Sequence, residues 1–461
     1  MKNSTLSPIR LEVDHAGKGV VSHAGIVLPA RVAETSGLVE GLSQALAPWR
    51  APTAVFDPGH MLTQLALAVA AGGDHLVDIR ELAGADTIVG PVPSPATISR
   101  LLAVLADDVD RVESVVQQAI SRAREHVWNR AENRPSLRAP SAENPVIIDI
   151  DATLITAHSD KEHAAPTYKK GYGHHPLLAY CDHGPGGGGE PVAALLRPGN
   201  AGANTAADHK KLLATALKSI PGINTPRPGK RVLVRTDGAG ASHKFLEHLH
   251  RKRVQYSIGF ALTPALAALV DDMPDQAWQS ALTSDGDTRE GAEVVELTGV
   301  ADLSHWPAGM RLIVRAERPH PGAQLRFTDA SGRRLTAFVT NTRRGHIQTL
   351  ELRHRQRARC EDRIRTAKDT GLAKLPLQTT AQNRIWILIC QLAQLLLAWS
   401  QLIALDATPA ATWEPKRLRL RLLSVAASLA RHARKTRLHL DETAPWGHLI
   451  TRGLARLEDP G

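Results

Sequence analysis

Apolar residues recur at helical spacing along the first 135 residues of the chain. Two helices are predicted over 57–73 and 94–108, where an aspartate or a serine and then a proline precede the apolar positions. Such a pair is a typical helix start, because the polar side chain caps free N–H groups and proline has no N–H group to leave unpaired. A longer amphipathic helix is predicted over 109–132, and the polar, proline-containing stretch 136–145 predicts a linker.

After the linker the pattern changes to short runs of β-branched and other apolar residues, which are typical of buried strands. These strands are predicted over 146–155, 176–182, 191–199, 231–238 and 254–260. Amphipathic helices are predicted over 204–220 and 241–252, before and after the fourth strand. The order of three strands, helix, strand, helix and strand indicates a mixed sheet, in which antiparallel hairpins are followed by crossover units.

A second block of strand-like runs follows, and turn residues separate its members. The runs are 293–299, 311–317, 324–330 and 334–341, and they predict an antiparallel sheet inserted into the first fold.

From residue 350 the pattern is helical again, with helices predicted over 379–405 and 416–437. The apolar run 385–399 is too short for a comfortable membrane span and contains two glutamines, so we expect a buried core helix there.

The composition indicates which kind of partner and which cell compartment to expect. The chain has 461 residues, 56 Lys and Arg against 46 Asp and Glu, and a net charge of +10. This surplus suggests an anionic partner such as nucleic acid, although a basic protein without such a partner has the same balance. Three cysteines, far apart and without a CxxC pair, favour neither a disulfide framework nor a cysteine zinc site. We expect a cytoplasmic protein without a secretory signal, because the first residues contain no apolar run.

Three aspartates lie on the predicted strands. Asp149 and Asp151 are two residues apart and therefore face the same side of strand 146–155, and Asp237 ends strand 231–238. A carboxylate on a buried strand must pair, lie at the exposed end of the strand or bind a cation. Carboxylate oxygens suit Mg²⁺ or Mn²⁺ better than Zn²⁺. Each aspartate taken alone is also compatible with a turn or cap residue.

A polar stripe is predicted on the arginine-rich segment 354–372. Its members follow steps of 3, 4, 4 and 3 residues and are His354, Arg357, Glu361, Arg365 and Lys368. A solvated helix face with Glu361 as a salt-bridge partner would show the same stripe. Alternatively, Glu361 binds a metal ion and the basic residues neutralise the phosphates of DNA.

These motifs resemble a known family. The spacing H-x2-R-x3-E-x6-K, from His354 to Lys368, is similar to the Y-R-E-K signature of DDE transposases of bacterial insertion sequences, with histidine in place of tyrosine. The blocks DIDAT and VRTDG resemble those around the first and second catalytic aspartates. Longer segments, among them FDPGHMLTQLALAVAAGGD and DIDATLITAHSDKEHAAPTYKKGYGHHPLLAYCD, resemble the IS-thirteen-eighty family of the IS-four-like superfamily. The resemblance covers nearly the whole chain.

The resemblance implies an α/β fold: a ribonuclease H-like core, which is a mixed five-stranded sheet with helices, an antiparallel β insertion, and α-helical N-terminal and C-terminal regions. The implied domains are 1–135 (helical, DNA-binding or dimerisation), 136–145 (linker), 146–275 with 350–405 (catalytic core), 276–349 (β insertion) and 406–461 (basic, helical).

It also implies that Asp151, Asp237 and Glu361 are the catalytic residues and hold two Mg²⁺ or Mn²⁺ ions per active site. Asp151 takes the first place because DAT matches the family pattern, and Asp149 is the alternative ligand. The implied activity is cut-and-paste DNA transposition, with cleavage at terminal inverted repeats and strand transfer into target DNA. The alternatives are a ribonuclease H-like nuclease and a catalytically silent, domesticated transposase that only binds DNA.

The implied contacts with DNA come from several regions. Arg357 and Lys368 would bind phosphates near the scissile bond, and His354 would donate a hydrogen bond to phosphate. A basic residue on the same stripe, Arg365, is a further candidate. Trp278 and Trp306 flank the start of the β insertion and are candidates for base stacking, with core packing as the alternative.

End recognition is expected outside the core. Segment 94–106 would be the second helix of a helix-turn-helix with Arg100 near the groove, or a plain core helix. Basic segments at 416–421 and 431–437 would follow the DNA backbone. Synapsis of two ends implies a homodimer on DNA, in the cytoplasm at the bacterial nucleoid, and no membrane partner.

Overall fold

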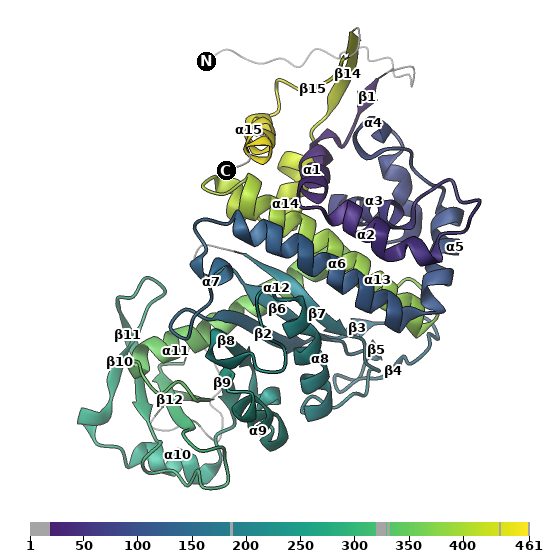
Figure 1. The fold of residues 1–461 in the computed structure, drawn as a ribbon. Helices are drawn as coiled ribbons and strands as arrows, with labels where there is room; N and C mark the ends of the chain where they lie inside the picture. Colours follow the sequence, from purple (N-terminus) through teal and green to yellow (C-terminus); the bar gives the residue numbers. More distant parts are fainter. Residues whose placement is uncertain (1–18, 185–187, 320–328, 330–331, 433–434, 460–461) are drawn as a thin grey trace, which may run out of the picture.

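The computed structural model describes residues 19–184, 188–319, 329, 332–432 and 435–459 (Figure 1). A bundle of N-terminal helices packs with the C-terminal helix α13 (Thr380–Trp399) above a large mixed sheet. The long helices α6 (Val109–Asn129) and α13 lie side by side between the bundle and the sheet.

The N-terminal helices confirm the helical prediction. They are α1 (Val27–Thr35), α2 (Leu38–Leu46), α3 (Pro58–Ala71), α4 (Asp86–Val89), α5 (Pro95–Ala106), α6 and α7 (Pro135–Arg138). The predicted caps are present: Asp57 accepts a hydrogen bond from the His60 amide, and Ser94 accepts one from the Thr97 amide. The apolar faces of α3 and α5 pack against α13, which explains their leucine and isoleucine spacing.

One mixed sheet of nine strands, in the order β10-β11-β12-β13-β9-β8-β2-β6-β7, forms the centre of the molecule. Its predicted core strands are β2 (Val146–Ala152), β6 (Leu177–Asp182), β7 (Gly189–Leu195), β8 (Val232–Thr236) and β9 (Gln255–Phe260). β2, β6 and β7 are antiparallel neighbours, and β2, β8 and β9 are parallel neighbours. Helices α8 (Ala206–Ser219) and α9 (His243–Arg251) make the crossovers before and after β8, as the sequence pattern predicts.

The second strand block extends this sheet. Its strands are β10 (Gln279–Leu282), β11 (Thr288–Glu296), β12 (Arg311–Glu317) and β13 (Arg334–Thr340), and all are antiparallel as expected. They were expected to form an antiparallel sheet inserted into the first fold, and β13 pairs with β9, so the block continues the core sheet. The predicted run 324–330 lies outside the described residues except for Asp329. A short helix, α10 (Pro264–Asp271), precedes the block, and a small sheet of β3 (Ile155–Thr156), β4 (Ala165–Pro166) and β5 (Tyr172–His174) follows β2.

The C-terminal region corrects one prediction. Helices α11 (Ile347–Arg355), α12 (Arg359–Ala367), α14 (Pro415–Leu418) and α15 (Gly447–Glu458) are present, but the helix expected over 416–437 ends at Leu423. A hairpin of β14 (Ala427–His432) and β15 (Lys435–Leu440) follows, and β1 (Val20–Val21) pairs with β14. The apolar positions recur at a spacing of two, and Leu429 faces Leu438 across the pair. Their partner strand comes from the other end of the chain, which local pattern does not reveal.

Helix α13 confirms the expectation of a core helix. The stretch Thr380–Ala404 is the one candidate among the described residues that is long and apolar enough to cross a membrane. Of its most apolar window, 94% is buried inside the protein, between the bundle and the sheet. A capping box at Thr379 and Gln382 fixes its start.

A buried carboxylate joins α6, α13 and the sheet. Glu190 of β7 accepts hydrogen bonds from Arg124 Nε (3.0 Å), Trp128 Nε1 (2.8 Å) and Trp399 Nε1. Burial alone would raise the pKa of Glu190, but Arg124, His183 and Trp399 lower it to about 2. The ionised carboxylate is therefore the form that the fold requires.

Replacing Arg124 by methionine is expected to lower the free energy of unfolding by about 3–5 kcal/mol, because Glu190 would be left as a buried charge without its cation. Urea unfolding measures this loss. The matched control is Arg122→Met, an exposed residue of the same helix, which should stay within about 0.5 kcal/mol of the wild type.

The folded pKa of about 2 lies below the value of about 4.3 for free glutamate, so the contribution of Glu190 is fully present above about pH 4.3 and is lost as the pH falls toward 2.

Candidate active site

Two of the predicted carboxylates lie side by side at one edge of the sheet. Asp151 is near the C-terminal end of β2, and Asp237 directly follows β8. These strands are parallel, and Ile150 of β2 is in register with Thr236 of β8, so each aspartate comes immediately after a paired residue. The C-terminal edge of parallel strands is the usual place for ligands in α/β sheets.

The turn after β8 holds the second carboxylate in place. The side chain of Asp237 accepts a hydrogen bond from the Ala239 amide (3.0 Å) at the start of a short 3₁₀ turn, Gly238–Gly240. A Cβ atom at Gly240 would lie 2.0 Å from Oγ1 of Thr236, so this position requires glycine. The second glycine of the GAG sequence after the aspartate therefore has a structural cause.

The electrostatics of Asp151 show that the two carboxylates interact. Burial and the negative charge of Asp237 raise the pKa of Asp151, and Arg357 opposes this rise. The side chain of Asp151 is 16% exposed, so solvent and small ions can reach it. Two neighbouring carboxylates with this repulsion fit a divalent cation, which would neutralise both of them.

Arg357 links the third predicted carboxylate to this pair. Glu361 lies in the first turn of α12 with a side chain that is 68% exposed, and its Oε1 is 3.5 Å from Nη2 of Arg357. The Nη1 atom of the same arginine lies 3.0 Å from Oδ2 of Asp151. Arg357 therefore bridges Asp151 and Glu361, and Asp237 lies beside Asp151 at the same edge of the sheet.

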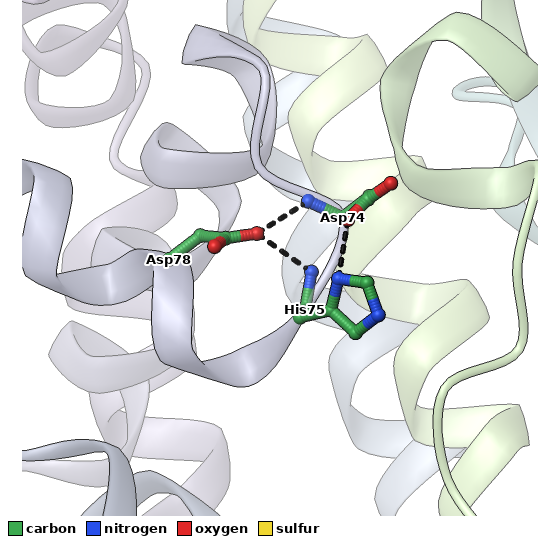
Figure 2. Close-up of side chains that lie close together, drawn as sticks. All are labelled: Asp74, His75 and Asp78. Carbon is green, nitrogen blue, oxygen red and sulfur yellow. Dashed lines mark hydrogen bonds and ion pairs between the residues drawn. The ribbon is translucent and has the colours of Figure 1, made fainter.

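A tighter acidic cluster lies elsewhere, in the helical N-terminal region. Asp74, His75 and Asp78 are the one group among the described residues in which three or more candidate metal-ligand atoms all lie within 4.8 Å of one another (Figure 2). Asp78 accepts hydrogen bonds from the amides of Asp74 (2.8 Å) and His75 (2.9 Å), and Asp74 pairs with His75 and with Lys374 (2.7 Å). These contacts cap the 3₁₀ helix Leu76–Leu82 and connect it to the segment that precedes α13.

The three predicted carboxylates do not form such a close group. The ligand atoms of Asp151, Asp237 and Glu361 do not all lie within 4.8 Å of one another. Glu361 is the exposed member, and its present partner is Arg357.

The alternative ligand, Asp149, has different neighbours. It lies on the same face of β2 as Asp151, as the spacing predicts, but it is fully buried. Its Oδ1 is 2.6 Å from Nε of Arg235, and its Oδ2 is 2.7 Å from Nη2 of Arg235 and 2.6 Å from Nη1 of Arg363. Both oxygens are therefore held by arginines, and Asp151 is the better candidate ligand. The sequence reasoning did not identify Arg235 and Arg363, although each lies two residues from a predicted carboxylate.

Comparison with known proteins identifies the family. The family described as Transposase DDE domain group 1 matches residues 3–460. The chain belongs to this family. It is a DNA transposase, an enzyme that cleaves and transfers DNA strands. A solved structure, the cryo-EM structure of piggyBac transposase in a synaptic complex with hairpin DNA, is similar over 94% of this chain and 82% of that chain, with 12% identity and a TM-score of 0.41. A search of curated proteins gives no match.

In this transposase the side chain of His354 packs against the sheet, and its expected contact with phosphate stays a prediction. The ring stacks on Phe338 of β13 (centroids 4.4 Å apart), and its Nδ1 is 3.0 Å from Oγ of Ser257 on β9. Burial, with the positive charges of Arg357 and Arg235, lowers the pKa of His354 to about 3. The imidazole is therefore neutral and packs on the extended sheet, which the sequence pattern placed in a separate insertion.

The predicted polar stripe is also divided in the transposase. A 3₁₀ turn, Gln356–Ala358, separates α11 from α12, so the stripe does not follow one continuous α-helix. Lys368 lies on the side of the carboxylates, where its Nζ donates to the carbonyl of Leu154 (3.1 Å), just after β2. Arg365 instead pairs with Asp362 (3.0 Å) and Glu414 (2.9 Å) at the surface.

The remaining candidates for DNA contact are distributed over the transposase. Trp306 is half-buried, stacks on His243 of α9 (4.7 Å between centroids) and meets the edge of Phe260 at the end of β9. Trp278 is half-buried beneath the guanidinium of Arg333. Both base stacking and packing are compatible with this exposure, so their role stays a prediction.

Arg100 is exposed on α5 and donates a hydrogen bond to Thr97 (3.3 Å). The opposite face of α5, with Ile98 and Leu102, is buried against the bundle. Helix α5 therefore packs into the core on one face and exposes Arg100 on the other. The contact of Arg100 with the DNA groove stays a prediction.

Proposed function

We propose that Asp151, Asp237 and Glu361 form the metal site of an insertion-sequence transposase with a ribonuclease H-like core. The observation that carries this proposal is the placement of Asp151 and Asp237 at the ends of neighbouring parallel strands, with Arg357 joining Asp151 to Glu361. The strand order β7-β6-β2-β8-β9, three antiparallel strands and then two parallel ones, supports such a core. The spacing of Arg357, Glu361 and Lys368 supports membership of the Y-R-E-K group and of the bacterial IS-thirteen-eighty family.

The donor set fits Mg²⁺ or Mn²⁺, because all three candidate ligands are carboxylates and the nearby histidine, His354, is turned into the sheet. A site of this kind would use bound divalent ions as Lewis acids for an in-line displacement at phosphorus. Asp151 and Asp237 would hold the ions at the sheet edge, and Glu361 would complete the site from α12. Arg357 already lies between two carboxylates, and we expect it to pair with the scissile phosphate when cations neutralise them.

We further propose that the partners are the terminal inverted repeats of the element and its target DNA, bound by a homodimer in the bacterial cytoplasm. Three free, buried cysteines are compatible with a reducing compartment. The hairpin β14–β15 supports a contact with DNA, because it projects from the bundle at the top of Figure 1 and presents basic residues. Among the described residues of the hairpin, the exposed cations are Arg431, Lys435 and Arg437.

Replacing these three hairpin cations together by glutamine is expected to weaken the binding of DNA ends. Each lost phosphate contact reduces the slope of log K against log salt by about 0.9, so the slope should fall by about 2 to 3. Fluorescence anisotropy with end DNA over a range of salt concentrations measures it.

The control for the hairpin variant removes three exposed cations from another surface. Lys211 and Lys218 of α8 and Arg227 beyond it serve this purpose. The same loss of slope in both triple variants would contradict a specific role of the hairpin, because net charge alone would then explain it.

The proposed function is tested by an in vitro cleavage assay on the DNA that flanks the gene, with and without Mg²⁺. We expect cleavage at the element ends that requires the metal, and transfer of a pre-cut 3′-hydroxyl end into target DNA. Cleavage without strand transfer would instead indicate a nuclease on the same core. Binding of end DNA without metal affinity or cleavage would indicate a domesticated, silent protein.

A further inference from the structure

Each of the three proposed metal ligands has a buried charged residue two positions away. Asp149 precedes Asp151 on β2, Arg235 precedes Asp237 on β8, and Arg363 follows Glu361 on α12. Asp149 and Arg235 are 0% exposed, and Arg363 is 7% exposed. On a strand, a spacing of two places both side chains on the same face, so each strand directs its buried charge and its ligand toward the same side of the sheet.

These buried charges bind one another. Arg235 makes two contacts with Asp149, at 2.6 and 2.7 Å, and thereby joins β8 to β2. Arg363 reaches from α12 to Oδ2 of the same aspartate at 2.6 Å. Arg235 also donates to the carbonyl of Arg353 (2.9 Å) in the last turn of α11. One carboxylate and two guanidinium groups therefore connect all three elements that carry the ligands.

A second aspartate completes the group. Asp182 at the end of β6 accepts a hydrogen bond from Nη2 of Arg235 (2.5 Å) and forms an ion pair with Nη2 of Arg363 (2.9 Å). Burial alone would raise the pKa of Asp182, but Arg363 and Arg235 lower it to about 2. Two aspartates and two arginines thus form a neutral group, which we call the buried ion-pair cluster: Asp149, Asp182, Arg235 and Arg363.

We propose that the buried ion-pair cluster fixes α12 against β2 and β8 and so sets the position of Glu361 relative to Asp151 and Asp237. Its four members are positioning residues, and this inference rests on the proposed function of the three carboxylates. A buried ion pair is often no more stabilising than apolar residues of the same size, so stability gives little reason for four charges here. A better reason for the four charges is that they fix the geometry of the site. Residues packed behind metal ligands orient those ligands and tune their affinity for the metal.

The test compares two conservative variants, Arg363→Lys and Arg124→Lys. Arg363→Lys keeps the positive charge but cannot bind Asp149 and Asp182 through a planar fork. Arg124→Lys makes the same change in a separate buried ion pair, where Arg124 binds Glu190 and the carbonyls of Ser219 and Pro191. Both variants perturb a buried arginine, but only the first touches the buried ion-pair cluster.

The readouts are Mn²⁺ binding to the full chain by calorimetry and the Mg²⁺ concentration for half-maximal cleavage. We expect Arg363→Lys to raise the Kd for Mn²⁺ by about 10- to 100-fold and the Mg²⁺ requirement in parallel. Arg124→Lys should lower the melting temperature but leave the Kd for Mn²⁺ within about twofold of the wild type. Equal Mn²⁺ binding in Arg363→Lys and wild type, or equal weakening in both variants, would overturn the inference.

A milder variant covers the case in which Arg363→Lys does not fold. Asp182→Asn leaves both arginine contacts of Asp149 in place, and we expect an intermediate rise in the Kd for Mn²⁺; an unchanged Kd would overturn the inference. Failure of the proposed function gives a different result, because Mn²⁺ binding to the wild type would then be absent or insensitive to Glu361→Gln.

Discussion

Replacing Glu361 by glutamine is expected to reduce DNA strand cleavage by more than about 100-fold while binding of the element ends stays nearly unchanged. Loss of a group behind a metal ligand costs about 10- to 100-fold, and loss of a ligand itself should cost more. Glu361 is 68% exposed and has one long ion pair, so the substitution removes little from the fold. Cleavage in Mg²⁺ buffer and gel-shift binding of end DNA measure the two quantities.

The neighbouring acid offers a matched control for this variant. Asp362 is on the same turn of α12, is also 68% exposed and also pairs with an arginine, Arg365. Asp362→Asn should therefore cleave at nearly the wild-type rate if the metal site is specific to Glu361. Wild-type cleavage by Glu361→Gln would remove this residue from the site and return it to the role of a salt-bridge partner of Arg357.

Replacing Asp151 by asparagine is expected to reduce cleavage by more than about 100-fold and to stabilise the fold at neutral pH. Burial and Asp237 raise the pKa of Asp151, so the ionised carboxylate is disfavoured in the folded state. A raised carboxyl pKa costs stability as the pH rises above the unfolded value of about 3.9, and the variant should gain stability only above that pH. Thermal unfolding at pH 3 and pH 7 measures the difference.

The variant Asp149→Asn should destabilise the fold, whereas Asp151→Asn should stabilise it. It leaves Arg235 and Arg363 short of a buried counter-charge, and we expect a loss of about 3–5 kcal/mol in the free energy of unfolding. The pair of variants therefore separates ligand from support on one strand face. A stable Asp149→Asn protein without Mn²⁺ binding, together with an active Asp151→Asn protein, would reverse the assignment.

Local pattern was sufficient for much of the fold. The helix starts at Asp57 and Ser94, the five core strands with their order, and the core helix at 379–405 all depend on periodicity and capping within a few residues. For the same reason the sequence placed Asp149 and Asp151 on one face of a strand, Asp237 at the end of another and Glu361 on a helix.

What local pattern could not supply is the partner of each side chain. Asp149 and Asp151 look alike in sequence, but the first meets Arg235, 86 residues away, and Arg363, 214 residues away. His354 belongs to the arginine-rich segment, yet Phe338 and Ser257 enclose it because β13 pairs with β9. The basic hairpin β14–β15 gains a third strand, β1, from the opposite end of the chain. Periodicity is a property of neighbouring residues, whereas ion pairing, burial and strand partnership depend on residues that only folding brings together.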